Sequence, residues 1–326
     1  MTEGTRAARR SRSTRSVRWA NVLGLAACLA VGASACSGGS SDSSGSTAST
    51  TKAPATSTTT TAPPVELPAD RPVEVHVPSS VADGEAAPLV VLLHGYGVDG
   101  NGQAAYLRMT EAADEAGMLL VAPDGTENAR GQRFWNATDA CCGPGSDIDD
   151  SAYLADVITK VSQDHAVDPD RIFVVGHSNG GFMANRMACD HADTIAAIVS
   201  IEGSTYEDAS ACDPSEPVSV LLVHGTADTT IPYDGGKIGP NPFPSAEGTL
   251  DRWVELDGCK ADADDPEPAD HQIVKDLPPA TVTAHSGCED DTAVELWTQP
   301  DGVHIPPFTD DFSAQLLTWL DAHPKA

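Results

Sequence analysis

Residues 171–182, with the sequence RIFVVGHSNGGF, constrain the fold of this chain more than any other segment. The apolar run 172–175 predicts a buried strand, and 182–189 has helical character with no helix-breaking residue. The motif G-x-S-x-G lies between them, with Ser178 at its centre. A serine on a tight turn from strand to helix points its hydroxyl out of the sheet, beside the free N–H groups of the helix N-terminus. We therefore predict that Ser178 is a nucleophile, with an ordinary glycine-rich connection as the alternative.

The first 36 residues have the organisation of an export signal. Six arginines occur within residues 1–18, an apolar run follows over 19–35, and a tract of Ser and Gly begins after Cys36. A basic segment, an apolar segment and small residues are typical of such signals. The sequence ASAC at 33–36 resembles the cleavage box of a bacterial lipoprotein, which predicts a lipid on Cys36. The alternatives are a plain secretory signal and an uncleaved anchor, for which the run is short.

The composition changes twice more along the chain. Residues 37–68 consist almost entirely of Ser, Thr, Ala, Gly and Pro. Such a segment cannot bury enough apolar surface to offset the entropy lost on ordering, so we predict a disordered linker. Residues 69–326 have the length and composition of one α/β domain.

The charge of the chain is strongly acidic. There are 48 Asp and Glu residues against 19 Lys and Arg, for a formal net charge of −29. This balance argues against nucleic acid or another polyanion as partner and is compatible with a neutral substrate. We expect a monomer that meets the membrane only through its lipid anchor. No spacing typical of a metal site is present, and the acidic run 147–150 is interpreted as helix capping, so neither a metal nor another cofactor is expected.

Apolar runs alternate with helical patterns through the proposed domain. Strands are expected over 71–77, 88–93, 118–122, 172–175, 195–201, 218–223 and 292–297, and helices over 102–117, 147–165, 182–189, 250–256 and 312–320. The run PLVVLL at 88–93 suits a central strand that is buried on both faces. Strands alternating with helices predict a mainly parallel sheet with helices on both faces.

A nucleophilic serine needs a base and an orienting acid. In the α/β-hydrolase fold these follow in the order serine, acid, histidine. Asp228 lies just after the apolar strand 218–223, and His304 lies in the loop between the last strand and the last helix. We predict Asp228 as the acid and His304 as the base, the alternatives being a turn aspartate and a surface histidine. The histidines that directly adjoin the predicted strands are expected to be structural: His94, His177 and His224.

A second set of residues is expected to bind the substrate. The oxyanion of an acyl-transfer intermediate needs two N–H donors, for which we predict the backbone groups of Asn179 and Tyr96. The ring of Tyr96 is also a candidate contact for the acyl group. Trp135 is a further candidate for substrate binding, with a packing role as its alternative.

Several motifs together resemble a known family. GHSNGGFMANRMAC, HGTAD followed by IPY, LLHGYG, and ACCG followed by DIDD are similar to the polyhydroxybutyrate depolymerase and feruloyl esterase group of α/β-hydrolases, which includes exported actinobacterial lipoproteins. The resemblance covers roughly residues 70–326 and implies the α/β-hydrolase fold with the triad Ser178, Asp228 and His304. Many members have His-Thr-Trp-Pro at the catalytic histidine, whereas residues 304–307 here read HIPP.

Six cysteines follow the predicted lipid site: Cys141, Cys142, Cys189, Cys212, Cys259 and Cys288. An even number in an exported chain predicts disulfides. The resemblance further implies a bond between Cys259 and Cys288. The other four are expected to form two bonds, with the adjacent Cys141 and Cys142 taking separate partners.

These observations favour an exported serine esterase, either a cell-surface lipoprotein or freely secreted. It would hydrolyse hydroxyalkanoate polyesters or oligomers, or feruloyl and other aryl esters, through an acyl-enzyme. An acyltransferase or a prolyl-oligopeptidase-like peptidase is an alternative, because water and other acceptors compete for the same acyl-enzyme. A non-catalytic binding lipoprotein of the cell envelope is the alternative outside the enzymes.

Overall fold

The computed structural model describes residues 64–141, 147–260 and 271–326. The predicted export signal with Cys36, most of the predicted linker, and Cys142 lie outside the described residues. Residues 64–68, which composition assigns to the linker, are described, and Leu67 packs against the core. No helix in the described part of the chain has the length and apolar character needed to cross a membrane.

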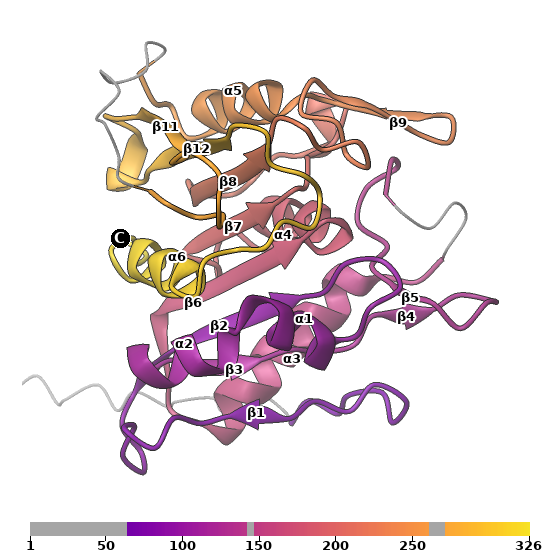
Figure 1. Cartoon of the computed structure of the whole chain (residues 1–326). Helices are drawn as coiled ribbons and strands as arrows, with labels where there is room; N and C mark the ends of the chain where they lie inside the picture. The colour runs from indigo at the N-terminus through magenta and orange to yellow at the C-terminus, as the bar shows by residue number, and fades with distance from the viewer. Residues whose placement is uncertain (1–63, 142–146, 261–270) are drawn as a thin grey trace, which may run out of the picture. The chain divides into compact units, whose positions relative to one another are not determined.

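An eight-stranded sheet lies at the centre of the domain, in the order β1-β3-β2-β6-β7-β8-β12-β11 (Figure 1). The six inner strands run parallel, and β1 and β11 are antiparallel edge strands. These results confirm the predicted α/β class and mainly parallel sheet. The strand bounds are β1 Val75–His76, β2 Ala87–Leu93, β3 Leu119–Val121, β6 Val167–His177, β7 Ala197–Ile201, β8 Ser219–Gly225, β11 Thr281–His285 and β12 Val294–Gln299.

Helices cover both faces of this sheet. Every residue of β2, β7 and β8 is buried, as expected for strands with helices on either side. One apolar layer joins the sheet to α3 (Asp150–Asp164), α4 (Asn179–Asp190) and α5 (Ala246–Leu256). The other joins it to α1 (Gly100–Leu107), α2 (Met109–Ala116) and α6 (Phe312–Asp321). The core therefore consists of two layers separated by the sheet.

The helix predicted over 102–117 is in fact two helices. Arg108 separates α1 from α2 with a left-handed φ of 54°, and its N–H caps the carbonyl groups of Ala104 and Ala105. Leu107 and Met109, on either side of the break, are both buried. The turn at Arg108 thus allows neighbouring residues to reach the same apolar layer, which one continuous helix would not.

Three β elements were not expected from the sequence. The edge strand β11 pairs with β12 in antiparallel register, and its central residues are only partly buried, so it lacks the apolar run that marked the inner strands. Two small hairpins complete the set. They are formed by β4 (Thr126–Glu127) with β5 (Arg133–Phe134), and by β9 (Gly236–Ile238) with β10 (Asn241–Phe243).

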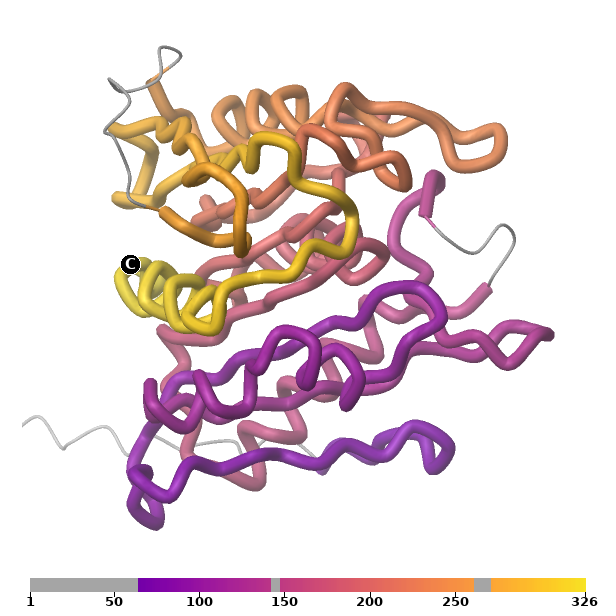
Figure 2. Tube along the Cα trace, in the orientation of Figure 1, coloured from indigo at the N-terminus to yellow at the C-terminus, as the bar shows by residue number. Residues whose placement is uncertain are grey.

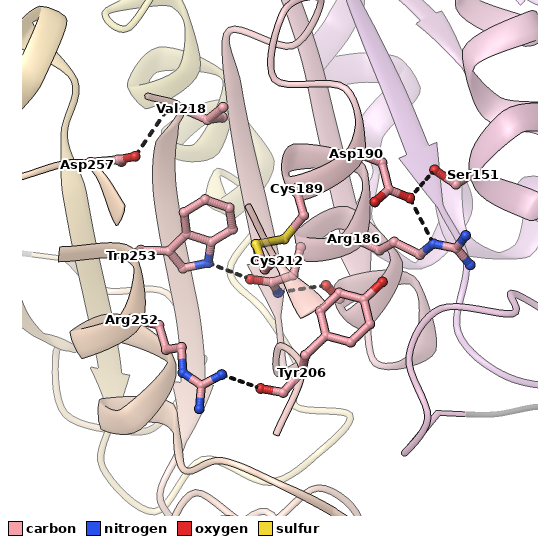
Figure 3. The surroundings of a disulfide bond; sticks show 12 residues. Ser151, Arg186, Cys189, Asp190, Tyr206, Cys212, Val218, Arg252, Trp253 and Asp257 are labelled. Carbon is pink, nitrogen blue, oxygen red and sulfur yellow. Dashed lines mark hydrogen bonds and ion pairs between the residues drawn. A yellow bond between two sulfur atoms is a disulfide. The ribbon is translucent and has the colours of Figure 1, made fainter. Parts of the chain in front are cut away.

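Two disulfides join described residues. Cys259 and Cys288 are bonded, as the family resemblance implied. Cys189, on α4, is bonded to Cys212 in the loop after β7 (Figure 3). The expected pairing of Cys141 and Cys142 with Cys189 and Cys212 is therefore wrong. The fold brings the side chains of Cys189 and Cys212 together, although they are 23 positions apart in the chain, and Cys141 is itself disulfide-bonded.

The Cys189–Cys212 bond anchors the far end of the helix that begins at the serine turn. Near it, Trp253 (labelled in Figure 3) donates an indole hydrogen bond to Asn185 at 2.8 Å. Asn185 in turn donates to Ser200 at 3.0 Å. These contacts tie α4 to α5 and to β7. The orientation of α4 is thus held by a covalent bond and by buried hydrogen bonds.

Asp257, just after α5, is a fully buried carboxyl group. Its Oδ1 accepts a hydrogen bond from the Val218 N–H at 3.3 Å (Figure 3), and its Oδ2 has no hydrogen-bond partner within the described residues. Burial raises the pKa of Asp257 from 3.8 to about 7, and the nearby charge of Glu289 adds to the increase. The folded protein therefore holds this proton more tightly than the unfolded chain, and ionisation of Asp257 opposes folding as the pH rises from about 4 to 7.

Replacement of Asp257 by Asn is expected to raise the free energy of unfolding at pH 8 by about 1–3 kcal/mol, because the amide cannot ionise. Near pH 4 the carboxyl group is largely protonated in the folded state and partly protonated in the unfolded chain. The substitution should therefore change the free energy of unfolding much less at this pH. Urea unfolding at both pH values measures the effect. Glu289→Gln, which removes only the nearby charge, is the matched control. It should raise the free energy of unfolding at pH 8 by a smaller amount. Equal differences at the two pH values would contradict this role of Asp257.

Candidate active site

Ser178 lies in the turn between β6 and α4 with φ of 56°, a conformation that residues other than glycine rarely adopt. Its N–H donates to the carbonyl oxygen of Ile201 at 2.8 Å. A Cβ atom at Gly176 would lie 1.9 Å from the carbonyl oxygen of Gly180, and one at Gly180 would lie 2.2 Å from that of Leu93. Only glycine fits these close backbone contacts, which hold the serine in its strained turn.

Three of the predicted site residues come together at the carboxyl ends of the sheet strands. The Nε2 atom of His304 lies 2.9 Å from Oγ of Ser178, and its Nδ1 atom lies 2.6 Å from Oδ2 of Asp228. His304 is in the long segment between β12 and α6, which extends away from the sheet before it returns (Figure 2). Since a carboxylate only accepts, Nδ1 carries the proton and the lone pair of Nε2 faces the hydroxyl. This arrangement can accept the serine proton.

The Asp228 side chain is fully buried. Its Oδ1 accepts hydrogen bonds from the N–H groups of Thr230 at 2.7 Å and Ile231 at 2.9 Å, and its Oδ2 accepts from His304. Burial acts to raise the pKa of Asp228, but these hydrogen bonds outweigh it and the pKa lies below the ordinary value of 3.8. Asp228 is therefore an anion at neutral pH with each oxygen oriented.

The turns that carry Asp228 and His304 are in direct backbone contact. A Cβ atom at Gly225 would lie 2.3 Å from the carbonyl oxygen of Gly302. The N–H of Ala227 donates to that same oxygen at 2.8 Å. The parallel register of β8 and β12, which pairs Gly225 with Gln299, brings the two turns to the same level. The acid and the base are thus positioned by one continuous set of contacts.

The N–H groups of Tyr96 and Asn179 donate no hydrogen bond to any described residue. The N–H of Gly95, by contrast, donates to Oε1 of Gln103 at 3.2 Å. A Cβ atom on Gly95 would lie 3.5 Å from Cβ of Ser178, so the loop after β2 runs beside the serine. One unpaired donor thus belongs to the residue that follows Ser178 and the other to the loop beside it, and an oxyanion site would need both.

The side chains of Tyr96 and Trp135 differ in accessibility. Tyr96 is 41% exposed, and its hydroxyl donates to Gln132 at 3.0 Å. Trp135 is fully buried, which corrects its prediction as a substrate contact. Its indole N–H donates to the His94 carbonyl at 3.0 Å, and its backbone N–H donates to the side chain of Asn179 at 2.6 Å. Trp135 packs beneath the site and joins the loop after β2 to the start of α4.

Three buried histidines hold the loops of the site without being charged. His177 donates from Nε2 to the backbone carbonyl of His304 at 3.0 Å, and His224 donates to that of Ile231 at 2.8 Å. His94 accepts from the Gly125 N–H at Nε2 and donates from Nδ1 to the adjacent carbonyl. Burial lowers the pKa of all three, that of His177 to about 4. Their hydrogen bonds support the predicted structural role.

The acidic run at 147–150 caps and anchors α3. The Asp149 side chain accepts from the N–H of Ala152, and Asp150 forms a buried ion pair with Arg71 at 2.7 Å. These contacts confirm that Asp149 caps the helix. Within the described ranges, the acidic and histidine side chains close enough to share a metal ion are Glu202, Asp228 and His304, whose ligand atoms lie within 4.8 Å of one another. Because Nδ1 of His304 is protonated and bonded to Asp228, we assign this group to hydrogen bonding.

Glu202 is a site residue that the sequence analysis missed. It directly follows β7 and is 2% exposed. A signal was available, because a glutamate that follows a fully apolar strand occupies the same kind of strand-end position as Asp228. Its relation to Asp228 depends on contacts between loops far apart in the sequence.

The fold and the serine, histidine and aspartate geometry are compatible with acyl-transfer chemistry, and comparison with known proteins gives the family. Residues 79–241, half of the chain, match the model of the phospholipase/carboxylesterase family. The chain belongs to this family and is a carboxylesterase-type hydrolase.

Individual proteins similar to this chain include named esterases. The chain is 29% identical over 254 residues to the protein named "Putative esterase NocK" of Nocardia uniformis subsp. tsuyamanensis. The matched region covers 73% of this chain and 70% of that relative. It is 29% identical over 197 residues to feruloyl esterase B of Piromyces equi, covering 58% of this chain and 36% of the length of that relative. An acetyl xylan esterase from Aspergillus awamori shares the fold, with a TM-score of 0.56, 16% identity, and coverage of 78% of this chain and 95% of the other.

Proposed function

We propose that the protein is a serine esterase that cleaves neutral carboxylic esters through an acyl-enzyme. One observation carries the proposal. His304 lies within hydrogen-bond distance of both Ser178 (2.9 Å) and Asp228 (2.6 Å), although these residues come from three separate loops. Nucleophile, base and orienting acid are the three roles that acyl transfer by a serine requires.

In the acylation step, Oγ of Ser178 attacks the ester carbonyl carbon while its proton passes to Nε2 of His304. Asp228 keeps the ring in the tautomer that can accept this proton and stabilises the imidazolium that forms. The N–H groups of Tyr96 and Asn179 stabilise the oxyanion. The alcohol then leaves with the proton from His304, and the acyl group stays on Ser178.

In the deacylation step, water replaces the alcohol. Its proton passes to His304 as its oxygen attacks the acyl carbon, and the acid is released as Oγ regains the proton. No cofactor takes part in either step. A different alcohol in place of water would give transesterification, which makes the acyltransferase alternative directly testable.

We propose feruloyl and related aryl esters as the main substrate class. The names of the relatives, feruloyl esterase B of Piromyces equi and feruloyl esterase C of Emericella nidulans, support this class. Exposed apolar side chains also adjoin the site. Tyr96 follows the loop glycine beside Ser178, and Val303 (47% exposed) and Ile305 (65%) flank His304. The aliphatic pair favours hydroxyalkanoate oligomers as a second substrate class.

A hydrolysis panel tests the proposal. Purified protein is expected to hydrolyse p-nitrophenyl acetate and methyl ferulate, with an initial burst of p-nitrophenol that marks the acyl-enzyme. Polyhydroxybutyrate film and hydroxybutyrate oligomers test the second class, and added alcohols test for transfer. Cleavage of none of these esters by folded protein would overturn the proposal and favour a binding role.

We also propose that the protein works outside the cytoplasm as a monomer, attached to the membrane through a lipid on Cys36. Disulfide bonds, typical of oxidising compartments, support the extracellular part of this proposal. A neutral ester, rather than nucleic acid, is the partner compatible with the charge of the chain. Partition of wild-type protein into detergent, lost in Cys36→Ser, would support lipidation, and equal partition of the two would exclude it.

A further inference from the structure

Glu202 occupies an unusual position beside the site. Its φ is 49°, a left-handed conformation that is rare for a residue with a long side chain. Its N–H donates to the carbonyl oxygen of Val223 at 2.8 Å, and its side chain is buried below the turn that carries Asp228. Backbone strain of this kind persists where the surrounding structure enforces it and is common at functional sites.

The Glu202 carboxyl group has few partners that would stabilise a negative charge. Its two oxygens share the N–H of Gly225, at 3.2 and 3.1 Å. Nε2 of His224 lies 3.4 Å away, but its proton is directed to the carbonyl of Ile231 and the ring is neutral. Among the described residues no Lys or Arg pairs with Glu202. The titratable groups that face it are His224, Asp228, His304 and Tyr106.

Asp228 is better supplied with donors than Glu202. It accepts from two backbone N–H groups and from His304, and one of its oxygens lies within 4.8 Å of an oxygen of Glu202. Two carboxylates this close in a buried site cannot both be ionised, and the proton stays on the group with fewer donors. Burial, followed by the charge of Asp228, raises the pKa of Glu202 well above its ordinary value.

We propose that Glu202 is a positioning residue whose neutral carboxyl group donates a hydrogen bond to the Asp228 carboxylate and holds it against Nδ1 of His304. The proposal rests on the proposed function, because it assigns Asp228 as the orienting acid. Glu202 touches neither substrate nor the reacting atoms. Its effect on the reaction passes through the orientation of Asp228 and, through it, of the His304 ring.

Two substitutions separate hydrogen-bond donation from charge and from space filling. Gln in place of Glu202 keeps an N–H donor toward Asp228 and an acceptor for Gly225, so kcat for a p-nitrophenyl ester should stay within about threefold of wild type. Leu has similar volume but no donor, so Glu202→Leu is expected to lower kcat by about 10–100-fold with little change in KM, the loss expected for a hydrogen bond to a charged group. Asp257→Asn, which alters a buried acid elsewhere, is the matched control and should keep wild-type kcat.

The kinetic outcomes are decisive in both directions. If Glu202→Gln loses as much activity as Glu202→Leu, a charged Glu202 is needed and the proposal is wrong. Wild-type kcat in folded Glu202→Leu would also overturn it. If the Leu variant does not fold, infrared spectra near pH 6 give a second test, recorded in the Asp257→Asn background because Asp257, with a pKa of about 7, is also protonated at this pH. The carbonyl band of a protonated carboxylic acid should be present in Asp257→Asn and reduced when Glu202→Gln is added. An unchanged band in that double variant would contradict the proposal.

The infrared measurement also separates this inference from the proposed function. Recorded on Ser178→Ala combined with Asp257→Asn, it reports the proton on Glu202 whether or not the protein is an esterase. Full ester hydrolysis by Ser178→Ala would remove the proposed function and leave the Glu202 band intact. Loss of hydrolysis in Ser178→Ala without a Glu202 band would remove only the positioning role.

Discussion

Replacement of Ser178 by Ala is expected to lower kcat for ester hydrolysis by about 10⁴- to 10⁶-fold while the protein stays folded. The substitution removes the oxygen that His304 contacts at 2.9 Å, and no other hydroxyl group takes its place on that ring in the described structure. The backbone is little affected. Alanine has the same Cβ atom, so the strain at φ of 56° is unchanged, and the N–H bond to Ile201 is kept.

Steady-state hydrolysis of a p-nitrophenyl ester measures the loss, and urea unfolding checks the fold. Ser162→Ala is a suitable control, because this serine lies on α3 and its hydroxyl donates only to the Ile158 carbonyl in the preceding turn. The control should keep full activity. Substantial turnover by pure Ser178→Ala would exclude Ser178 as the nucleophile.

Replacement of Asp228 by Asn is expected to lower kcat by about 10⁴-fold. The two Asp228 oxygens have different partners, so the orientation of the amide can be foreseen. Its oxygen should remain on the N–H groups of Thr230 and Ile231, and its NH₂ group should then face Nδ1 of His304. Nδ1 becomes an acceptor and the ring proton moves to Nε2, which can no longer accept a proton from Ser178.

The measurement is kcat against pH for wild type and Asp228→Asn with a neutral ester. Asp149→Asn serves as the control, since asparagine also caps helices and this residue lies outside the site. A loss of less than about tenfold in Asp228→Asn would show that another group orients His304. Glu202, within 4.8 Å of both residues, would be the first candidate.

The parts of the site that were predictable from sequence are local or follow from strand order. The turn at Ser178 is marked by its glycines and by the apolar strand before it, because the close contacts at Gly176 and Gly180 exclude larger residues. Asp228 was predicted because it follows an apolar strand, at the edge where the carboxyl ends of parallel strands meet. His304 was predicted because it lies between the last strand and the last helix, in the order serine, acid, histidine. Each inference needed only the pattern of one segment and the order of the segments.

The features that escaped prediction depend on packing between distant segments. Trp135 is an aromatic residue of a type that often binds substrates, and the sequence does not reveal that it is buried. Only the packing of the folded chain shows this. The partner of Cys189 is determined by where the loop after β7 passes α4. The break at Arg108 arises because Leu107 and Met109 both pack into the core, and no glycine or proline in the sequence marks it.

The close contact between Gly225 and Gly302 means that the turn carrying Asp228 and the turn carrying His304 cannot move independently. A side chain larger than hydrogen at Gly225 would displace the Gly302 turn, and with it His304, without touching either reacting group. Changes in one turn therefore have to be matched by changes in the other during evolution. In an engineered variant with a new loop at this position, the turns that carry Asp228 and His304 would have to be replaced together. The turn that carries Ser178 could be kept unchanged.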